Sequence, residues 1–484
     1  MPKILELPIG ELKYALAGLS KIALTKSSLP ILRHVRIEPD GNNGIYLSGT
    51  DLECFATCRI AVTNPDGFPA CTVDFDALNK LVKTTRGDLA LVREDDGKLN
   101  VRYSIGDAFA RKPIETLPVV EWPAFPPNKN TSNPLDEAFK PAFRHALECA
   151  SVDSSRFVLN GACLDVSQPD CHTVVGTDGR QLYSANTFRF PLAESVIIPD
   201  RKFLNWSGFV DDGPWRLAVE ASKEVIWVRF ESTRWTVVTK SIDGQYPNWR
   251  QVVPESEGKS VVRLSPEAVA SILDALPCLP VWNENDMPVQ LESQAGQLVL
   301  KAHPEDSDDW THVPVAGSNT TGAPFQIKLN RKYLSKALRF GFTKFDVYSA
   351  QEPVLFTAPG RKMLISPLWT KPPETPTPAV PIIPQSTATE AVPASAPSAA
   401  GSVPTTTEAK KPMTTATTTT KEPNSPLKEA AAQIEKIKET LKAGLAECAT
   451  VLTALKSAER EQKAVEKEVD GVRSTLRALQ KVEI

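Results

Sequence analysis

One arrangement of apolar and polar positions occurs three times in the first part of the chain. Residues 31–37 and 45–48 are rich in β-branched and apolar residues, and the polar stretch Pro39–Gly44 separates them. Asp, Asn and Gly tolerate a positive φ, so this pattern predicts a β-hairpin, followed by a third, alternating strand. The arrangement returns at 157–185 and, in a weaker form, at 287–315. The copies are offset by roughly 130 residues, which is about the size of a whole small domain.

Each of these three segments is preceded by a helical pattern. Ile9–Leu24 carries apolar residues at helical spacing, which predicts an amphipathic helix after a short strand. Corresponding helices are predicted over 135–150 and over 266–276. The last of these has a strong start signal, because Ser265 can cap it and Pro266 occupies its first position.

A second helix is predicted after each segment. These helices cover 76–85, with Asp76 as N-cap, 200–209 and 331–340. Short strands follow each of them, so all three units share the order strand, helix, strands, strand, helix, strands. This order predicts an antiparallel α+β domain, with two helices in each copy, used three times in tandem. The boundaries that we predict are 1–127, 133–253 and 259–369.

The composition changes after Trp369. Residues 370–426 are mostly Thr, Pro, Ala and Ser, which predicts a disordered linker with polyproline II character. From 427 to 484 the pattern is helical, with Leu427, Ile434, Leu441, Cys448 and Leu455 seven residues apart. The repeat changes phase near 459–462, so this segment is predicted to be a coiled coil or a hairpin of two helices. It could pair the tails of two chains or recruit a helical partner.

Composition and charge narrow the function classes. A hydrophobic content of 41% and a charged content of 23% are ordinary for a soluble globular protein. The net charge of −3 excludes a uniformly basic nucleic-acid binder, although it allows a basic face. The N-terminus does not read as a secretory signal and no window is long and apolar enough for a membrane span, so we expect a cytoplasmic protein. The 8 scattered cysteines form no disulfide framework and are expected to be reduced.

Several ordered motifs resemble one known family. The motifs are Leu29-Pro30-Ile31-Leu32, Gly49-Thr50-Asp51-Leu52-Glu53, Leu159-Asn160-Gly161, Thr177-Asp178-Gly179, Ser195–Pro199, Asp243–Arg250 and Leu364–Leu368. In this order they resemble the bacterial DNA polymerase III β sliding clamp, a processivity factor. The similarity covers about residues 1–369, whereas the linker and the coiled coil lie outside the family pattern.

The resemblance implies a head-to-tail homodimeric ring of six similar domains around duplex DNA, close to the nucleoid. A sliding tether must hold DNA without reading its sequence, so it needs positive charge on the helices that line the hole. The basic residues at matching positions are Lys26, Lys80, Lys83, Lys140, Arg144, Arg156, Arg331, Lys332 and Lys336. The helix over 266–276 departs from this expectation, because it has neither Lys nor Arg.

The resemblance also implies a pocket between domains 2 and 3 that binds short peptides from polymerases and clamp-loader subunits. The matching positions are Leu159, Thr177, Gly179, Arg180, Leu182, Pro247, Val252, Tyr333, Leu364, Pro367 and Leu368. Such a set forms an apolar groove with a few polar edges, although ordinary interdomain core would have the same composition. The sequence departs from the family at Gln181, Gln251, Ser366 and Trp369, which predicts an altered peptide preference.

Catalytic chemistry finds no support in the sequence. Asp51 and Asp178 precede turns, where Asp is common, and we find no phosphate-binding glycine loop and no Cys/His cluster. We therefore predict a non-catalytic protein without metal or cofactor. Two alternatives remain beside the encircling clamp. One is a clamp-derived scaffold of a specialised repair or mobile-element system that no longer encircles DNA. The other is a stalk protein with a Thr/Pro tract, which the apparent lack of an export signal disfavours.

Overall fold

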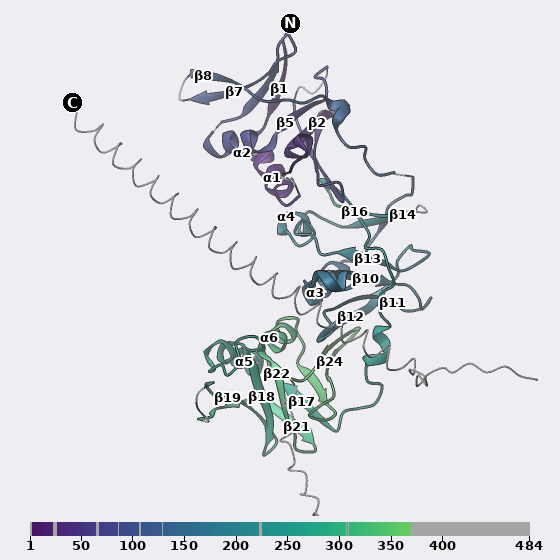
Figure 1. Ribbon diagram of the computed structural model, residues 1–484, viewed down its shortest axis with the longest axis vertical. Coiled ribbons are helices and arrows are strands. Elements are labelled where there is room, and N and C mark those ends of the chain that lie inside the picture. The colour runs from purple at the N-terminus through teal and green to yellow at the C-terminus, as the bar shows by residue number, and fades with distance from the viewer. Residues whose placement is uncertain are drawn as a thin grey trace, which may run out of the picture. The chain divides into compact units, whose positions relative to one another are not determined.

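The computed structural model describes residues 2–22, 27–63, 67–85, 87–105, 108–127, 129–221, 225–305, 307 and 309–368 (Figure 1). Lys26, Trp369, the predicted linker and the predicted coiled coil lie outside these ranges. None of the helices within them is long and apolar enough to cross a membrane.

The same order of helices and strands occurs three times. The first repeat consists of β1 (Lys3–Leu7), α1 (Ile9–Leu19), β2 (His34–Pro39), β3 (Gly44–Thr50), β4 (Cys54–Ala61), β5 (Cys71–Asp74), α2 (Phe75–Thr84), β6 (Leu89–Arg93), β7 (Leu99–Ile105) and β8 (Ala108–Pro113). The second consists of β9 (Asn133–Pro134), α3 (Phe139–Cys149), β10 (Gly161–Asp165), β11 (His172–Thr177), β12 (Gln181–Phe188), β13 (Val196–Pro199), α4 (Ser207–Val210), β14 (Arg216–Ala221), β15 (Ile226–Glu231) and β16 (Trp235–Lys240).

The third repeat has the same order with one added strand, β21. Its elements are β17 (Ser260–Leu264), α5 (Pro266–Cys278), β18 (Pro288–Gln294), β19 (Gln297–Ala302), β20 (Thr311–Val315), β21 (Ser318–Gly322), β22 (Gln326–Asn330), α6 (Arg331–Arg339), β23 (Lys344–Val347), β24 (Val354–Ala358) and β25 (Arg361–Ile365). The predicted α+β fold class is therefore confirmed for the described residues.

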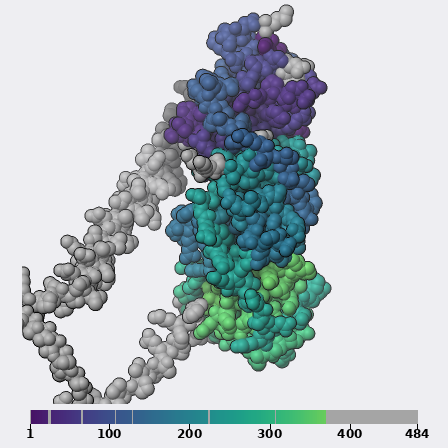
Figure 2. Space-filling view, turned by 90° about the vertical axis from the view of Figure 1, so that its right-hand side faces the viewer, coloured from purple at the N-terminus to yellow at the C-terminus, as the bar shows by residue number. Residues whose placement is uncertain are grey.

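The antiparallel sheets join neighbouring repeats. One sheet has the order β5-β2-β3-β4-β16-β15-β14-β9, so β4 of the first repeat pairs with β16 of the second, with Ala56 opposite Val237. Another has the order β13-β10-β11-β12-β25-β24-β23-β17-β21, so β12 pairs with β25, with Leu182 opposite Leu364. In the space-filling view the C-terminal strands, in green, lie directly against the second repeat (Figure 2). The remaining described sheets, β1-β6-β7-β8 and β20-β19-β18-β22, belong to single repeats.

The helices pack against one side of these sheets and enclose the core (Figure 1). In the second repeat α3 lies on β11 and β12 and buries Phe139 and Phe143. A side chain at Gly176 on β11 would place its Cβ 1.9 Å from the carbonyl oxygen of Ala146. Only glycine permits this close approach of helix and strand. Truncation of a buried aromatic such as Phe143 typically costs about 3–5 kcal/mol of stability.

Several predicted strand and helix starts differ from the structure. The strand predicted from residue 157 starts only at Gly161, after a 3₁₀ segment over Ser154–Leu159. The predicted strand 31–37 begins with a 3₁₀ turn over Pro30–Arg33, and β2 starts only at His34. The N-cap of α2 is Asp74 rather than Asp76, since the Asp74 Oδ1 accepts a hydrogen bond of 2.7 Å from the backbone N–H of Ala77. The side-chain geometry decides between two acidic residues that the sequence alone could not separate.

Three helices are markedly shorter than predicted. The helix predicted over 135–150 is α3, which covers only Phe139–Cys149. The helix α1 ends at Leu19, and residues 20–22 form a turn. In the second repeat, the predicted helix 200–209 is only the single turn Ser207–Val210. Asn205, Ser207 and Gly208 interrupt this segment, and these residue types favour caps and turns over helix interiors.

Candidate functional site

A groove of about 330 Å³ lies where the second repeat meets the third. Its walls come from β12, β25 and the connector that joins the two repeats. The lining residues are Leu159, Thr177, Gly179, Arg180, Gln181, Leu182, Pro247, Asn248, Trp249, Val252, Pro353, Leu364 and Ser366. Most of the large side chains among them are apolar, and Val252 at its rim is 54% exposed. A short peptide segment with apolar side chains is the kind of ligand that fits such a surface.

The structure brings most of the predicted pocket residues together in this groove. Leu159, Thr177, Gly179, Arg180, Leu182, Pro247, Val252 and Leu364 all line it. Tyr333, Pro367 and Leu368 do not belong to the lining. Leu368 is instead half-buried, and its backbone N–H donates to the carbonyl of Lys328 at 2.8 Å.

Sequence reasoning missed three lining residues, Asn248, Trp249 and Pro353. The first two lie in the motif Asp243–Arg250, of which the sequence predicts only Pro247 to line the pocket. Their position directly after Pro247, itself predicted to line the pocket, was the available signal.

A tight corner of backbone shapes one end of the groove. The Asp178 Oδ1 accepts hydrogen bonds from the backbone N–H groups of Arg180 at 2.8 Å and Gln181 at 2.9 Å, and Gly179 has a φ of +87°. The Tyr333 hydroxyl donates to the other carboxylate oxygen of Asp178 at 3.0 Å. Burial, followed by the Asp178 charge, raises the pKa of Tyr333 to about 12, so this hydroxyl keeps its proton. Tyr333 therefore holds the Asp178 carboxylate in place and does not itself line the groove.

The equivalent corner between the first and second repeats is built differently. Leu52, with a φ of +74°, stands where the second corner has Gly179. The guanidinium of Arg201 forms ion pairs with Asp51 at 3.3 Å and Glu53 at 3.1 Å. A leucine side chain and these ion pairs thus occupy the first corner. At the second corner the Arg156 guanidinium lies against Gly179 and donates to the carbonyl of Asp178 at 3.2 Å.

Trp249 is held firmly between the connector and the sheet. Its Nε1–H donates to the Asp165 carboxylate at 2.8 Å, and the guanidinium of Arg250 lies 4.4 Å from its ring centroid while pairing with the same carboxylate. Burial alone would raise the pKa of Asp165, but hydrogen bonds from Ser167, Trp249 and Arg250 outweigh it and lower the pKa. The groove therefore has one fixed aromatic wall.

The predicted DNA-contacting residues lie on or near the helices and differ in accessibility. Lys80 and Lys83 on α2, Lys332 on α6, and Arg156 are exposed. Lys140 on α3 is only 12% exposed, because its ammonium donates to the carbonyl of Gly213 at 2.6 Å and pairs with Glu137 at 3.3 Å.

Two further predicted contacts, Arg144 on α3 and Lys336 on α6, are half-buried. The Lys336 ammonium donates to the backbone carbonyl of Glu148 on α3, across the boundary between repeats. Arg339 on α6, which belongs to the same basic helix, is exposed, and so is Lys13 on α1, which the sequence reasoning missed.

The chain is similar to known proteins, although no protein-family model matches it. The β sliding clamp of Pseudomonas putida is 25% identical to it over 321 residues, which cover 65% of this chain and 83% of that clamp. The β sliding clamp of Synechococcus elongatus is 23% identical over 345 residues, covering 68% and 88%.

Solved structures agree with this similarity. The β sliding clamp of C. crescentus superposes with a TM-score of 0.67 at 20% identity, covering 76% of this chain and 99% of that one. The DNA polymerase III subunit beta of Pseudomonas aeruginosa gives 0.64 at 20% identity, covering 76% and 100%. The chain has the fold of a β sliding clamp.

Within the clamp fold, one predicted DNA contact is wrong. Arg331 is only 3% exposed, and its guanidinium donates five hydrogen bonds of 2.6 to 3.2 Å. The acceptors are the backbone carbonyls of Leu276, Leu279, Pro280, Met287 and Pro288. Arg331 therefore fastens α6 to the end of α5, and it is not available to DNA. Basic residues at the first position of a helix look alike in the sequence, whether they face solvent or the core.

The cysteines in the described ranges are all unpaired. Burial raises the pKa of Cys54, Cys58, Cys71, Cys149 and Cys163 to about 12, so these thiols are protonated and unreactive near neutral pH. In the same ranges, no group of three or more His, Cys, Asp or Glu residues could hold a metal ion.

Proposed function

We propose that this protein is a DNA sliding clamp, a non-catalytic processivity factor for DNA polymerase. Two copies join head to tail into a ring around duplex DNA in the cytoplasm, and the groove between the second and third repeats binds peptide segments of polymerases and clamp-loader subunits. The observation that carries the proposal is the way in which sheets cross the boundaries between repeats.

The two junctions within the chain follow one rule. At each of them, the last strand of the first three-stranded segment of one repeat, β4 or β12, pairs with the last strand of the next repeat, β16 or β25. Two equivalent strands take part in neither junction. They are β20, which in the third repeat corresponds to β4 and β12, and β8, which in the first repeat corresponds to β16 and β25. Both lie at sheet edges in the described part of the chain.

A second copy supplies the missing partner for both edges. If β20 of each copy pairs with β8 of the other, the rule is satisfied at every junction and the ring closes with six repeats. The β8 end also exposes apolar surface, since Phe109 is 73% and Ile105 is 60% exposed. Exposed apolar residues on an unpaired edge strand indicate a surface that is covered in the assembly.

The helices supply the charge that a sliding contact needs. Lys80, Lys83 and Lys332 present flexible ammonium groups on helices that all lie on one side of the sheets (Figure 1). Such groups attract phosphates regardless of the base sequence, and this kind of binding weakens steeply with salt.

One observation favours a second function, a scaffold with the clamp fold that does not encircle DNA. The helix α5 carries Glu267 and Asp274 but no basic residue, and Arg331 is buried. The third repeat thus contributes less positive charge than the resemblance implied.

The native mass tests ring closure. We expect sedimentation of the chain truncated after residue 370 to give twice the mass of one chain, stable over a range of micromolar concentrations. Truncation removes the predicted coiled coil, which could otherwise pair the chains by itself. A monomer at these concentrations would favour the scaffold.

The role of the heptad pattern at 427–484 stays a prediction from the sequence.

A further inference from the structure

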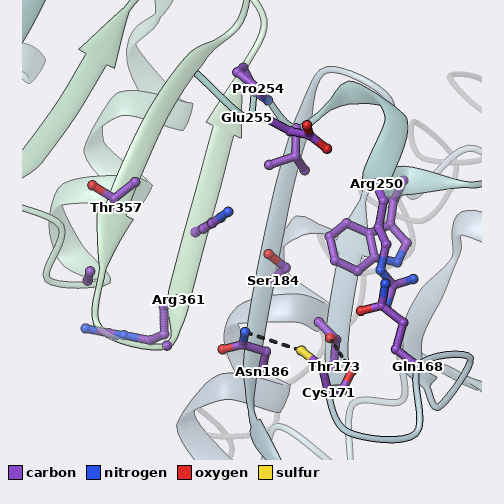
Figure 3. A pocket seen from close by; sticks show the side chains of 15 residues that line it. Gln168, Cys171, Thr173, Ser184, Asn186, Arg250, Pro254, Glu255, Thr357 and Arg361 are labelled. Atoms are coloured by element: carbon purple, nitrogen blue, oxygen red, sulfur yellow. Dashed lines mark hydrogen bonds between the residues drawn. The ribbon is translucent and has the colours of Figure 1, made fainter. Parts of the chain in front are cut away.

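A second cavity, of about 410 Å³, lies on the same sheet as the groove. Figure 3 shows the side chains that line this cavity. Strands β12 and β25 form its floor, and the end of the connector forms one wall. The polar and charged side chains that matter for its chemistry are Ser184, Asn186, Arg250, Glu255 and Lys362. In contrast to the apolar groove, it is therefore polar and charged.

The cavity and the groove are consecutive along the same pair of strands. On β12, Leu182 lines the groove and Ser184 lines the cavity. On β25, Leu364 lines the groove and Lys362 lines the cavity. Two residues along a strand span about 7 Å. Trp249 lines both spaces, so it stands at the boundary between them. A peptide that occupies the groove and continues past Trp249 reaches the cavity within about two residues.

Lys362 supplies the available positive charge of this cavity. Arg250 and Glu255 also line it, and Arg250 is already paired with Asp165. The Arg361 guanidinium lies on the other side of β25, where it donates to the carbonyl of Phe340 at 2.9 Å and lies 5.4 Å from the centroid of the Phe342 ring. Lys362 shows no ion pair or hydrogen bond from its ammonium to other residues that the structure describes. Its charge is available to a ligand, and Ser184 and Asn186 add neutral hydrogen-bonding groups.

We propose that this cavity binds an acidic segment of the same partner peptide whose apolar residues occupy the groove. The partner motif is then bipartite, with an apolar anchor on one side of Trp249 and Asp or Glu on the other. This inference rests on the proposed function of the groove. Charge-assisted hydrogen bonds from Lys362 to a carboxylate supply the attraction, and solvent exposure limits its strength to a modest gain in affinity.

Fluorescence anisotropy with the full-length protein tests this inference. The probe is a labelled peptide whose anchor combines a glutamine, two leucines and a phenylalanine. Its variants carry four glutamates or four glutamines at either end. We expect the glutamate extension at one end to tighten binding about threefold to tenfold over the glutamine extension. Lys362→Glu should abolish this gain while leaving the affinity of the glutamine-extended peptide unchanged.

Two further variants separate the possible outcomes. Lys98→Glu is the matched control, because Lys98 is exposed on a distant β-turn, and it should keep the gain. Val252→Asp at the groove rim should weaken every peptide, and binding that withstands it, or no binding by any probe, would refute the groove itself.

The cavity's role is refuted separately if the anchor binds but glutamates give no advantage at either end, or if the advantage survives Lys362→Glu. Competition by a DNA oligonucleotide that depends on Lys362 would identify the cavity as a phosphate site and would also overturn the proposal.

Discussion

Arg331 and Lys332 are neighbours at the start of α6, yet their side chains differ in burial and in the contacts that they make. Arg331 satisfies five backbone carbonyls and is buried, whereas Lys332 is exposed. We expect Arg331→Ala to lower the free energy of unfolding by about 3 kcal/mol or more, because buried acceptors lose their charged donor. We expect Lys332→Ala to change stability by less than about 0.5 kcal/mol.

Urea unfolding and DNA binding together check this division. Lys332→Ala should weaken binding to duplex DNA of any sequence and reduce the salt slope by about 1. Equal losses of stability in the two variants would contradict the assignment of Arg331 to the fold and of Lys332 to DNA.

His145 makes the contact between the second and third repeats sensitive to pH. Its ring stacks on Phe340 with a centroid distance of 3.8 Å. Burial, followed by the charges of Arg361 and Arg144, lowers the pKa of His145 from 6.5 to about 4. Between about pH 6.5 and 4 the unfolded chain therefore binds more protons than the folded chain at this residue, and the folded state loses stability as the pH falls.

We expect His145→Phe, which keeps an aromatic ring in the stack, to flatten the pH dependence of stability in this range. The measurement is urea unfolding of both proteins at several pH values between 7 and 4. An equal loss of stability in both would show that His145 is not the group responsible.

At the scale of elements, the exposed edge strand β8 carries the strongest prediction. We expect Phe109→Asp to convert the dimer of the chain truncated after residue 370 into a monomer, because a carboxylate then enters an apolar strand-to-strand contact. Val120→Asp is the matched control. Val120 is 90% exposed in the segment between β8 and β9 and belongs to neither strand, so this variant should remain a dimer. Sedimentation gives the answer, and a dimeric Phe109→Asp variant would rule out β8 as the interface.

The elements also show how far the sequence could lead. The three hairpins and α5 with its Ser265 cap follow from apolar periodicity and local capping chemistry, which are encoded in short stretches. The prediction of a helix over 200–209 was wrong. The helix propensity of this ten-residue segment is offset by Asn205, Ser207 and Gly208, which favour turns. Most of the groove was predictable from motif positions. The exclusion of Tyr333 was not, since it depends on a hydrogen bond to Asp178 from a distant helix.

For the whole molecule, the sequence indicates three similar domains but not how they join. The pairings of β4 with β16 and β12 with β25 unite residues that are far apart in the chain, and no local pattern specifies them. Once these pairings are known, the positions of β8 and β20 follow from the same rule. The resemblance found in the sequence implies the ring, and the structure adds the two strand edges, β8 and β20, at which we propose that it closes. The charge on the helices is an inference from the sequence that the structure has corrected at Arg331.

Topological retention on DNA tests the ring most directly. Clamps are loaded onto nicked circular plasmid by a bacterial clamp loader with ATP, and half of the sample is then cut once with a restriction enzyme before gel filtration at about 0.5 M salt, where phosphate contacts alone are weak. We predict that the protein stays with the intact circles and is lost from the linear DNA. Equal retention on both, or release from both, would contradict the claim that this protein encircles DNA.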